Sequence, residues 1–136
     1  MTSPYRGIEH LGIVVGDLDD AAHTYGEVLG LTLTGREELP ERGLAVQFVD
    51  TGGTRLELIA PTRADSEVSG FLGKRGEGLH HVCLRVDDLD ATLAALERRG
   101  TRLIDRIPRP GAQGSRVAFI HPKGAHGVLI ELVEKR

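Results

Sequence analysis

The sequence predicts an α+β fold made of two tandem copies of one βαβββ module. The first observation is an internal repeat, because residues 8–19 (IEHLGIVVGDLD) align without a gap with residues 79–90 (LHHVCLRVDDLD). The match recurs near the end of each half, where residues 54–59 (TRLELI) resemble residues 128–133 (VLIELV). A chain of 136 residues with 40% hydrophobic content can bury one core, whereas half that length is marginal. We therefore expect a single domain over 1–136, with module 1 at about 7–60, a connector at about 61–78 and module 2 at about 79–136.

Each element of module 1 has a local signal. Alternating apolar residues predict a first strand over 8–15, and Asp17 is expected to cap a helix that ends at Gly30. Further strands are expected near 31–37, 43–50 and 55–59, the last two joined by a tight turn at 51–54.

Module 2 repeats this order. We expect a strand over 79–86, a helix over 89–99 between Asp88 and Gly100, and strands near Arg102, Arg116 and Val128. The connector contains a short helical pattern for which Ser66 is the expected N-cap. Two interpretations stay open, a mobile cover over a site or a passive linker, and composition favours the linker at least as much as the cover.

Composition excludes several classes of protein. The formal net charge is −3, and the 17 basic residues are scattered among 20 acidic ones, which argues against binding to nucleic acid or to a membrane surface. Cys83 is the only cysteine, so we expect a buried free thiol rather than a disulfide framework. The N-terminus lacks the pattern of a signal peptide, and no apolar stretch is long enough to span a membrane. We expect a soluble cytoplasmic protein.

The two leading strands place a histidine on the same face. Because side chains alternate along a strand, Leu11, Ile13 and Val15 should pack under the module helix and leave His10 on the opposite, concave face. His81 follows the same parity in module 2.

The two trailing strands place a glutamate on that face. Glu57 and Glu131 each stand between apolar residues, a pattern that in one strand alone is typical of a solvated face. Their occurrence at equivalent points of a repeat favours a shared role. If the modules pair around a two-fold-like axis, two imidazoles and two carboxylates can converge on one divalent metal ion, so we expect one curved mixed sheet around a metal cavity.

These residues resemble the vicinal oxygen chelate (glyoxalase) superfamily and, within it, the methylmalonyl-CoA epimerase family, over nearly the whole chain. The stretches that carry the resemblance are 8–17 (IEHLGIVVGD), 54–61 (TRLELIAP), 71–88 (FLGKRGEGLHHVCLRVDD), 109–114 (RPGAQG) and 121–132 (HPKGAHGVLIEL). The resemblance implies a homodimer whose chains each bind one divalent ion through His10, Glu57, His81 and Glu131. Co²⁺ is the favoured ion, and Mn²⁺, Ni²⁺, Zn²⁺ and Fe²⁺ are possible. Some relatives have Gln at the position of Glu57, which would alter the charge of the site.

The implied reaction is interconversion of (R)- and (S)-methylmalonyl-CoA through an enolate, with the ion as a Lewis acid. Inversion needs proton exchange on both faces of the intermediate, for which we rank Glu131 first and Glu57 second. Some relatives have a glutamate on the third strand of module 1, where this chain reads 45–48 (AVQF) and offers only Gln47 as a polar partner.

Basic and polar residues are the candidates for contacts with the substrate. We name Gln47, Lys74, Arg109, Ser115, Arg116 and Lys123, with residues 111–115 as a backbone cradle for phosphate. Three other functions stay open: a glyoxalase I-like lyase acting on a glutathione hemithioacetal, a ring-cleaving dioxygenase, and a non-catalytic small-molecule binding or resistance protein. Four protein ligands argue against the dioxygenase, which normally uses three.

Overall fold

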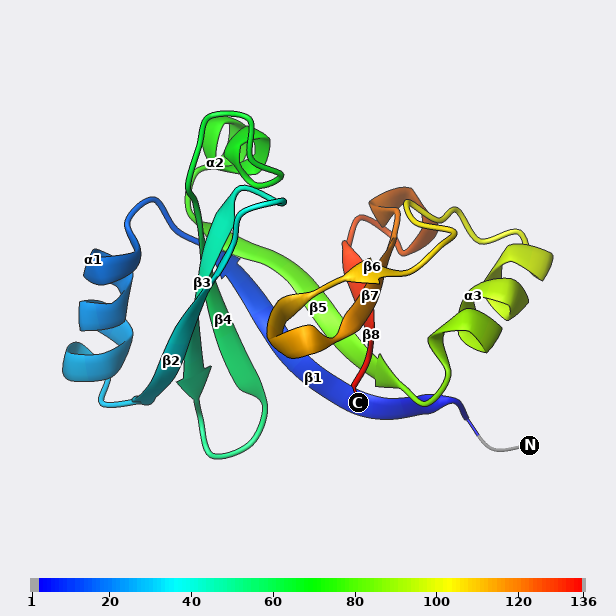
Figure 1. Ribbon diagram of the computed structural model, residues 1–136, viewed down its shortest axis with the longest axis horizontal. Helices are drawn as coiled ribbons and strands as arrows, with labels where there is room; N and C mark the ends of the chain where they lie inside the picture. The colour runs from blue at the N-terminus through cyan, green and yellow to red at the C-terminus, as the bar shows by residue number, and fades with distance from the viewer. Residues whose placement is uncertain (1–2, 136) are drawn as a thin grey trace. The chain divides into compact units, whose positions relative to one another are not determined.

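The computed structural model describes residues 3–135, and the predicted βαβββ module occurs in it twice (Figure 1). The first half comprises β1 (Tyr5–Val14), α1 (Leu18–Ala22) with a π-helical continuation (His23–Val28), β2 (Thr32–Leu39), β3 (Leu44–Asp50) and β4 (Arg55–Pro61). The short helix α2 (Ser69–Arg75) lies in the connector. The second half comprises β5 (Gly78–Val86), α3 (Leu89–Arg98), β6 (Arg109–Pro110), β7 (Arg116–Ile120) and β8 (Ile130–Glu134).

The strands pair in the same way in both halves. β1 is parallel to β4, which is antiparallel to β3, and β3 is antiparallel to β2. In the second half β5 is parallel to β8, β8 is antiparallel to β7, and β7 is antiparallel to β6. The strand order of the eight-stranded sheet is β2-β3-β4-β1-β5-β8-β7-β6, which confirms the predicted mixed sheet.

The chain divides into two compact units whose boundaries differ from those of the repeats. The first unit is His10–His80, and the second combines the residues up to Glu9 with those from His81 onward. The boundary therefore cuts both β1 and β5, and the connector belongs to the first unit.

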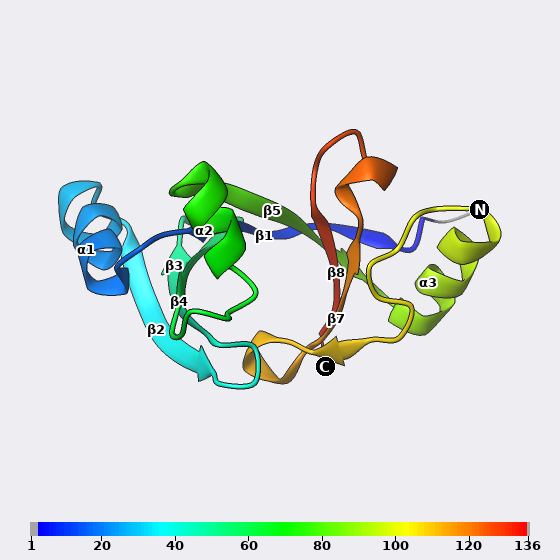
Figure 2. The ribbon, with the colours of Figure 1, turned by 90° about the horizontal axis from the view of Figure 1, so that it is seen from above.

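The core of the first unit lies between its helix and its strands. Val15, Val49 and Leu58 are buried together with Ala21 and Ala60, and Ile13 packs against them. Figures 1 and 2 both show α1 beside β2. Ile13 and Val15 thus face the helix, as the alternation predicted.

The second unit has an equivalent core. Its buried members are Val86, Leu89, Leu93, Ala118, Ile120 and Leu132, with Leu84 packed against them. On the other face of the same strands, Cys83 is buried with Val117 and Val133. Both the predicted faces of β5 and the predicted buried thiol are confirmed.

Two local predictions are wrong. Ser66 is not the N-cap of α2, because its hydroxyl accepts from the N–H of Val68 at 3.3 Å and the helix begins only at Ser69. The strand expected near Arg102 is reduced to a single bridge between Leu103 and Ile120. The outer strand is instead the two-residue β6, since Pro108 and Pro110 lack the N–H groups that a longer ladder needs.

The helices are short. The predicted helix after Asp17 is confirmed, but it changes from α to π at His23, where Leu29 N–H bonds Thr24 O at 2.9 Å. The Gly30 backbone then takes φ 81°, the left-handed conformation expected after a helix. Among residues 3–135, none of the helices has the length and apolar character needed to cross a lipid bilayer.

Candidate functional site

The first unit contains a buried histidine–glutamate pair. Gly12 of β1 lies opposite Glu57 of β4, so His10, two residues earlier, shares the face of Glu57. The two residues are 4% and 5% exposed, and His10 Nδ1 lies 3.2 Å from Glu57 Oε2. Both are ligand-type side chains removed from water.

The second unit contains the equivalent pair. Cys83 of β5 lies opposite Glu131 of β8, so His81 stands in the same relation to Glu131 as His10 does to Glu57. His81 and Glu131 are 6% and 5% exposed, and His81 Nε2 lies 3.1 Å from Glu131 Oε1. The predicted sharing of one strand face is confirmed within each unit.

Burial separates these pairs from an ordinary histidine–glutamate contact. His23 Nδ1 and Glu27 Oε2 also lie 3.2 Å apart, but their side chains are 59% and 79% exposed on the helical surface. Water solvates that pair, whereas a carboxylate in the interior needs a compensating positive charge or hydrogen bonds. A divalent cation is one such compensation.

Each pair has a phenylalanine beside it that the sequence analysis missed. Phe48 lies opposite Glu57 in the β3–β4 pair, and Phe119 lies opposite Glu131 in the β7–β8 pair. Phe119 also forms a T-shaped pair with the His81 ring at a centroid distance of 5.9 Å. The signal was present in the sequence, because residues 46–49 (VQFV) and 117–120 (VAFI) extend the repeat to the third strand of each module.

Arginines contact both phenylalanines, and Arg55 also contacts the glutamate of the first pair. The Arg55 guanidinium lies 5.0 Å from the centroid of Phe48, and its Nη2 donates to Glu57 Oε2 at 3.1 Å. The Arg109 guanidinium lies 5.3 Å from the centroid of Phe119, and its Nε lies 3.4 Å from a carboxylate oxygen of Asp105. The sequence analysis did not select Arg55, although a position two residues before Glu57 on one strand shares its face.

Gln47 lies away from the first pair. It stands opposite Leu58, a residue of the core under α1, and therefore on the other face of β3 from Phe48. Its amide oxygen accepts from Arg36 Nε at 2.6 Å, and its amide nitrogen donates to Gly35 O at 2.9 Å. Its predicted contact with substrate gains no support from this position.

Three predicted contacts come together in the second unit. Arg109, Ser115 and Arg116 line a hollow of about 350 Å³ with Pro108, Pro110 and Gly114. Arg116 is already engaged, since it donates to Glu134 at 3.1 Å and to Asp90 at 3.0 Å. Hydrogen bonds to Asp90 and then to Glu134 raise the pKa of the Arg116 guanidinium.

In the predicted backbone cradle, two of the N–H groups already donate to carbonyl oxygens of the same loop. Gly111 N–H bonds Ser115 O at 3.0 Å, and Ser115 N–H bonds Ala112 O at 3.2 Å. Lys123 is exposed beside His121 in the second unit, and Lys74 is exposed at the end of α2 in the first. The contacts of all these residues with substrate stay predictions.

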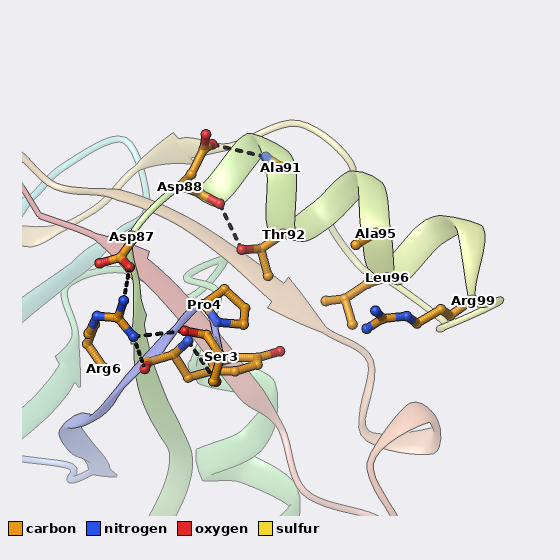
Figure 3. A pocket seen from close by; sticks show the side chains of 11 residues that line it. Ser3, Pro4, Arg6, Asp87, Asp88, Ala91, Thr92, Ala95, Leu96 and Arg99 are labelled. Carbon is orange, nitrogen blue, oxygen red and sulfur yellow. Dashed lines mark hydrogen bonds and ion pairs between the residues drawn. The ribbon is translucent and has the colours of Figure 1, made fainter. Parts of the chain in front are cut away.

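The second unit has another hollow, of about 350 Å³, between the start of β1 and α3 (Figure 3). Arg6 spans its edge and binds Asp87 at 2.5 Å and Ser3 O at 2.8 Å. Asp88 and Thr92 on its other side bond within the first turn of α3. None of the predicted site residues lines this hollow.

The chain is similar to known proteins both in sequence and in structure. Residues 9–119 match the family model of the glyoxalase/bleomycin resistance protein/dioxygenase superfamily. The mitochondrial methylmalonyl-CoA epimerase of Homo sapiens is 40% identical over 126 residues, which cover 92% of this chain and 72% of that protein. The crystal structure of methylmalonyl-CoA epimerase from Mycobacterium tuberculosis has a TM-score of 0.94 at 40% identity, covering 100% of this chain and 92% of that chain.

A second similar structure is that of a complex with a ligand. Methylmalonyl-CoA epimerase in complex with methylmalonyl-CoA and NH4+ has a TM-score of 0.89 at 38% identity, covering 98% of this chain and 96% of that chain. Lyases are less similar, since the probable lactoylglutathione lyase of Vibrio cholerae is 27% identical over 130 residues, or 95% of this chain and 91% of that protein.

The paired modules, each with a buried histidine and glutamate, and the match over residues 9–119 show that the chain belongs to the glyoxalase/bleomycin resistance protein/dioxygenase superfamily. Identity of 40% to both human and mycobacterial proteins then places it, within that superfamily, in the methylmalonyl-CoA epimerase family.

Proposed function

We propose that this protein interconverts (R)- and (S)-methylmalonyl-CoA with the help of one divalent metal ion. The observation that carries the proposal is the buried histidine–glutamate pair found at the same strand positions in both units, His10 with Glu57 and His81 with Glu131. Members of the family that act on this substrate are 40% identical to the chain. The four side chains would hold one ion together.

The residues present fit a divalent cation. Imidazole and carboxylate ligands suit Co²⁺, Mn²⁺, Ni²⁺, Zn²⁺ and Fe²⁺, and Co²⁺ is the ion we favour. The carboxylates of Glu57 and Glu131 carry a charge of −2, which the Arg55 guanidinium bonded to Glu57 offsets only in part, so the pairs would attract a divalent cation. When bound, the ion supplies a Lewis acid that counters the negative charge arising when the α carbon loses its proton.

The two glutamates are the candidates for moving that proton. Inversion requires removal of the α proton on one face of the planar intermediate and its return on the other, so two groups on opposite sides are needed. Glu131 is our first candidate and Glu57 our second.

Deuterium exchange tests this function. In D2O, metal-loaded protein should introduce deuterium at C2 of methylmalonyl-CoA, and chelation of the metal should stop it. Replacing Glu131 by Gln should lower the exchange rate by about 100-fold or more, the usual contribution of an acid–base group. Replacing the proposed ligand His10 by Ala should lower the exchange rate by weakening metal binding. Glu41→Gln, an exposed glutamate, is the matched control and should exchange like the wild type.

The outcomes separate the alternatives. Metal-loaded wild type that gives no exchange would falsify the assignment. Turnover of the glutathione hemithioacetal of methylglyoxal without C2 exchange would favour a lactoylglutathione lyase, the less similar class of relative. Metal-free protein that binds small molecules and leaves them unchanged would favour a binding or resistance protein.

We also propose, from the family resemblance, that the chain forms a homodimer and works in the cytoplasm. Analytical ultracentrifugation of metal-loaded protein tests the first proposal, and a sedimenting monomer at micromolar concentration would contradict it.

A further inference from the structure

We infer that Asp105 is a positioning residue, which holds the ring of Phe119 against the imidazole of His81 and so orients this proposed metal ligand before an ion binds. The inference rests on the proposed function and concerns the same site. Asp105, Phe119 and His81 all belong to the second unit, as does Arg109, which takes part in the arrangement.

Asp105 completes the backbone hydrogen bonds of Phe119 on the outer side of β7. The short strand β6 pairs with β7 at Arg116 and Val117. Further along β7, the N–H of Phe119 donates to Asp105 Oδ2 at 2.8 Å. The carbonyl oxygen of Phe119 accepts from the N–H of Ile104 at 2.9 Å and from that of Asp105 at 3.3 Å. Asp105 thus supplies an acceptor and a donor that an outer strand would otherwise provide.

The first unit satisfies the equivalent phenylalanine in another way. Phe48, the counterpart of Phe119 in the repeat, pairs with Gly35 of the eight-residue strand β2. The outer strand of the second module has only two residues, so a side chain takes the place of the backbone. A carboxylate suits this role, because its hydrogen bond with an N–H is stronger than one between neutral groups.

Asp105 also contacts the arginine that packs on the same ring. Its Oδ1 lies 3.4 Å from Arg109 Nε, and the Arg109 guanidinium lies 5.3 Å from the centroid of the Phe119 ring. One carboxylate therefore contacts both the backbone of Phe119 and the cation on its ring. The side chain of Asp105 is 16% exposed, so water screens these contacts less than it would at the surface.

The ring of Phe119 transmits this order to His81. Phe119 is 5% exposed, and the T-shaped pair that it forms with His81 has a centroid distance of 5.9 Å. Side chains in a close-packed interior have little room to turn. Together with Glu131, whose Oε1 lies 3.1 Å from His81 Nε2, Phe119 therefore orients the imidazole. Residues that orient a ligand in this way raise the affinity of a site for its metal.

Nuclear magnetic resonance of the metal-free protein tests the inference without any measurement of activity. The ring current of Phe119 shifts the proton resonances of the His81 imidazole, which are identified as those missing in His81→Ala. Asp105→Ala should lose this shift and should speed amide hydrogen exchange at Phe119 about tenfold, because that N–H has lost its acceptor. Asp105→Asn keeps an oxygen that can accept from the N–H and should retain most of the shift.

Metal binding gives a second measurement. The Co²⁺ affinity, determined by calorimetry, should fall about tenfold in Asp105→Ala, a typical loss when a residue that supports a ligand is removed. In a Phe119→Leu background, Asp105→Ala should change neither the His81 resonances nor the affinity further, because Asp105 acts through the ring. Asp87→Ala is the matched control, since it removes an exposed aspartate that binds Arg6 in the same unit, and it should behave like the wild type.

Three results would overturn the inference: unchanged His81 resonances in Asp105→Ala, a further loss from this change in the Phe119→Leu background, or an equal loss in Asp87→Ala. If Asp105→Ala does not fold by circular dichroism, Asp105→Leu, which has a similar shape and no acceptor, replaces it. Wild type that shows the expected dependence on Asp105 but no C2 exchange would contradict the proposed activity and leave the role of Asp105 intact.

Discussion

Histidines in this chain serve different purposes according to their surroundings. His10 and His81 are buried beside carboxylates, which suits metal ligands, whereas His23 makes the same kind of contact in solvent. The rings of His80 and Phe71 form a T-shaped pair with their centroids 5.0 Å apart. His121 is the N-cap of a 3₁₀ turn over 122–124, because its Nδ1 accepts from the N–H of Lys123 at 3.0 Å.

Protonation of His121 should affect stability. Burial, followed by the positive charges of Arg102 and Lys123, lowers the pKa of His121 below its ordinary value of 6.5. The unfolded chain then binds this proton more readily than the folded chain, so the contribution to stability is present above about pH 6.5 and is lost as the pH falls below it. His121→Asn keeps a cap acceptor that does not titrate.

Urea unfolding between about pH 7.5 and pH 5.5 measures this effect. The unfolding midpoint of His121→Asn should fall less with acid than that of the wild type. His121→Ala should be less stable at the higher pH and equally insensitive to acid at this position. Equal pH dependence in all three proteins would contradict the role assigned to the ring nitrogen.

At the scale of elements, both module helices begin with an aspartate as N-cap. Asp17 accepts from the N–H of Asp20 and Asp88 from the N–H of Ala91, each at 3.0 Å. The helices then diverge, since α1 gives way to a π turn while α3 stays α-helical to Arg98. Glu134 of β8 adds a second acceptor at the start of α3, for the N–H of Leu89 at 2.8 Å.

Removal of the Asp88 cap should destabilise the second unit. Asp88→Ala leaves an N–H of the first turn without its acceptor, and we expect a loss of about 1 kcal/mol in the free energy of unfolding. Asp88→Asn keeps an equally good cap and should stay within a few tenths of a kcal/mol of the wild type. Chemical denaturation measures both, and a loss of similar size in the two variants would assign the effect to charge rather than to capping.

At the scale of the molecule, the duplication distributes the proposed ligands over both units. His10 and Glu57 belong to the first unit, and His81 and Glu131 belong to the second. A ligand that binds only the folded state stabilises it by mass action. An ion held by both pairs should therefore stabilise the whole chain and depend on each unit.

Thermal unfolding with and without Co²⁺ tests this dependence. Co²⁺ at a thousandfold excess over its dissociation constant should add about 4 kcal/mol to the stability of the wild type. Both His10→Ala and His81→Ala should lose most of that gain, whereas His23→Ala, from the exposed pair, should keep it. Full stabilisation in either ligand variant would mean that one pair binds the ion alone.

Much of this organisation could be predicted from local pattern. The repeat defined the order of elements, and the alternation of side chains assigned His10, Glu57, His81 and Glu131 to the correct strand faces, because that alternation is a property of the extended backbone itself. The prolines around β6 were also visible, yet the sequence analysis expected a strand near Arg102. Only the hydrogen bonds of the folded chain show that β7 pairs there through a single bridge.

The sequence by itself determined the duplicated module, the family and the four ligand-type residues, since these depend on spacing along the chain. The tertiary structure determined which charged and polar side chains contact one another. It brought Arg116 to carboxylates of α3 and β8, turned Gln47 toward Arg36, and set Arg55 against Phe48 and Glu57. Long polar side chains reach across strands to residues distant in sequence. Which residues they contact depends on strand register, and no local pattern contains that register.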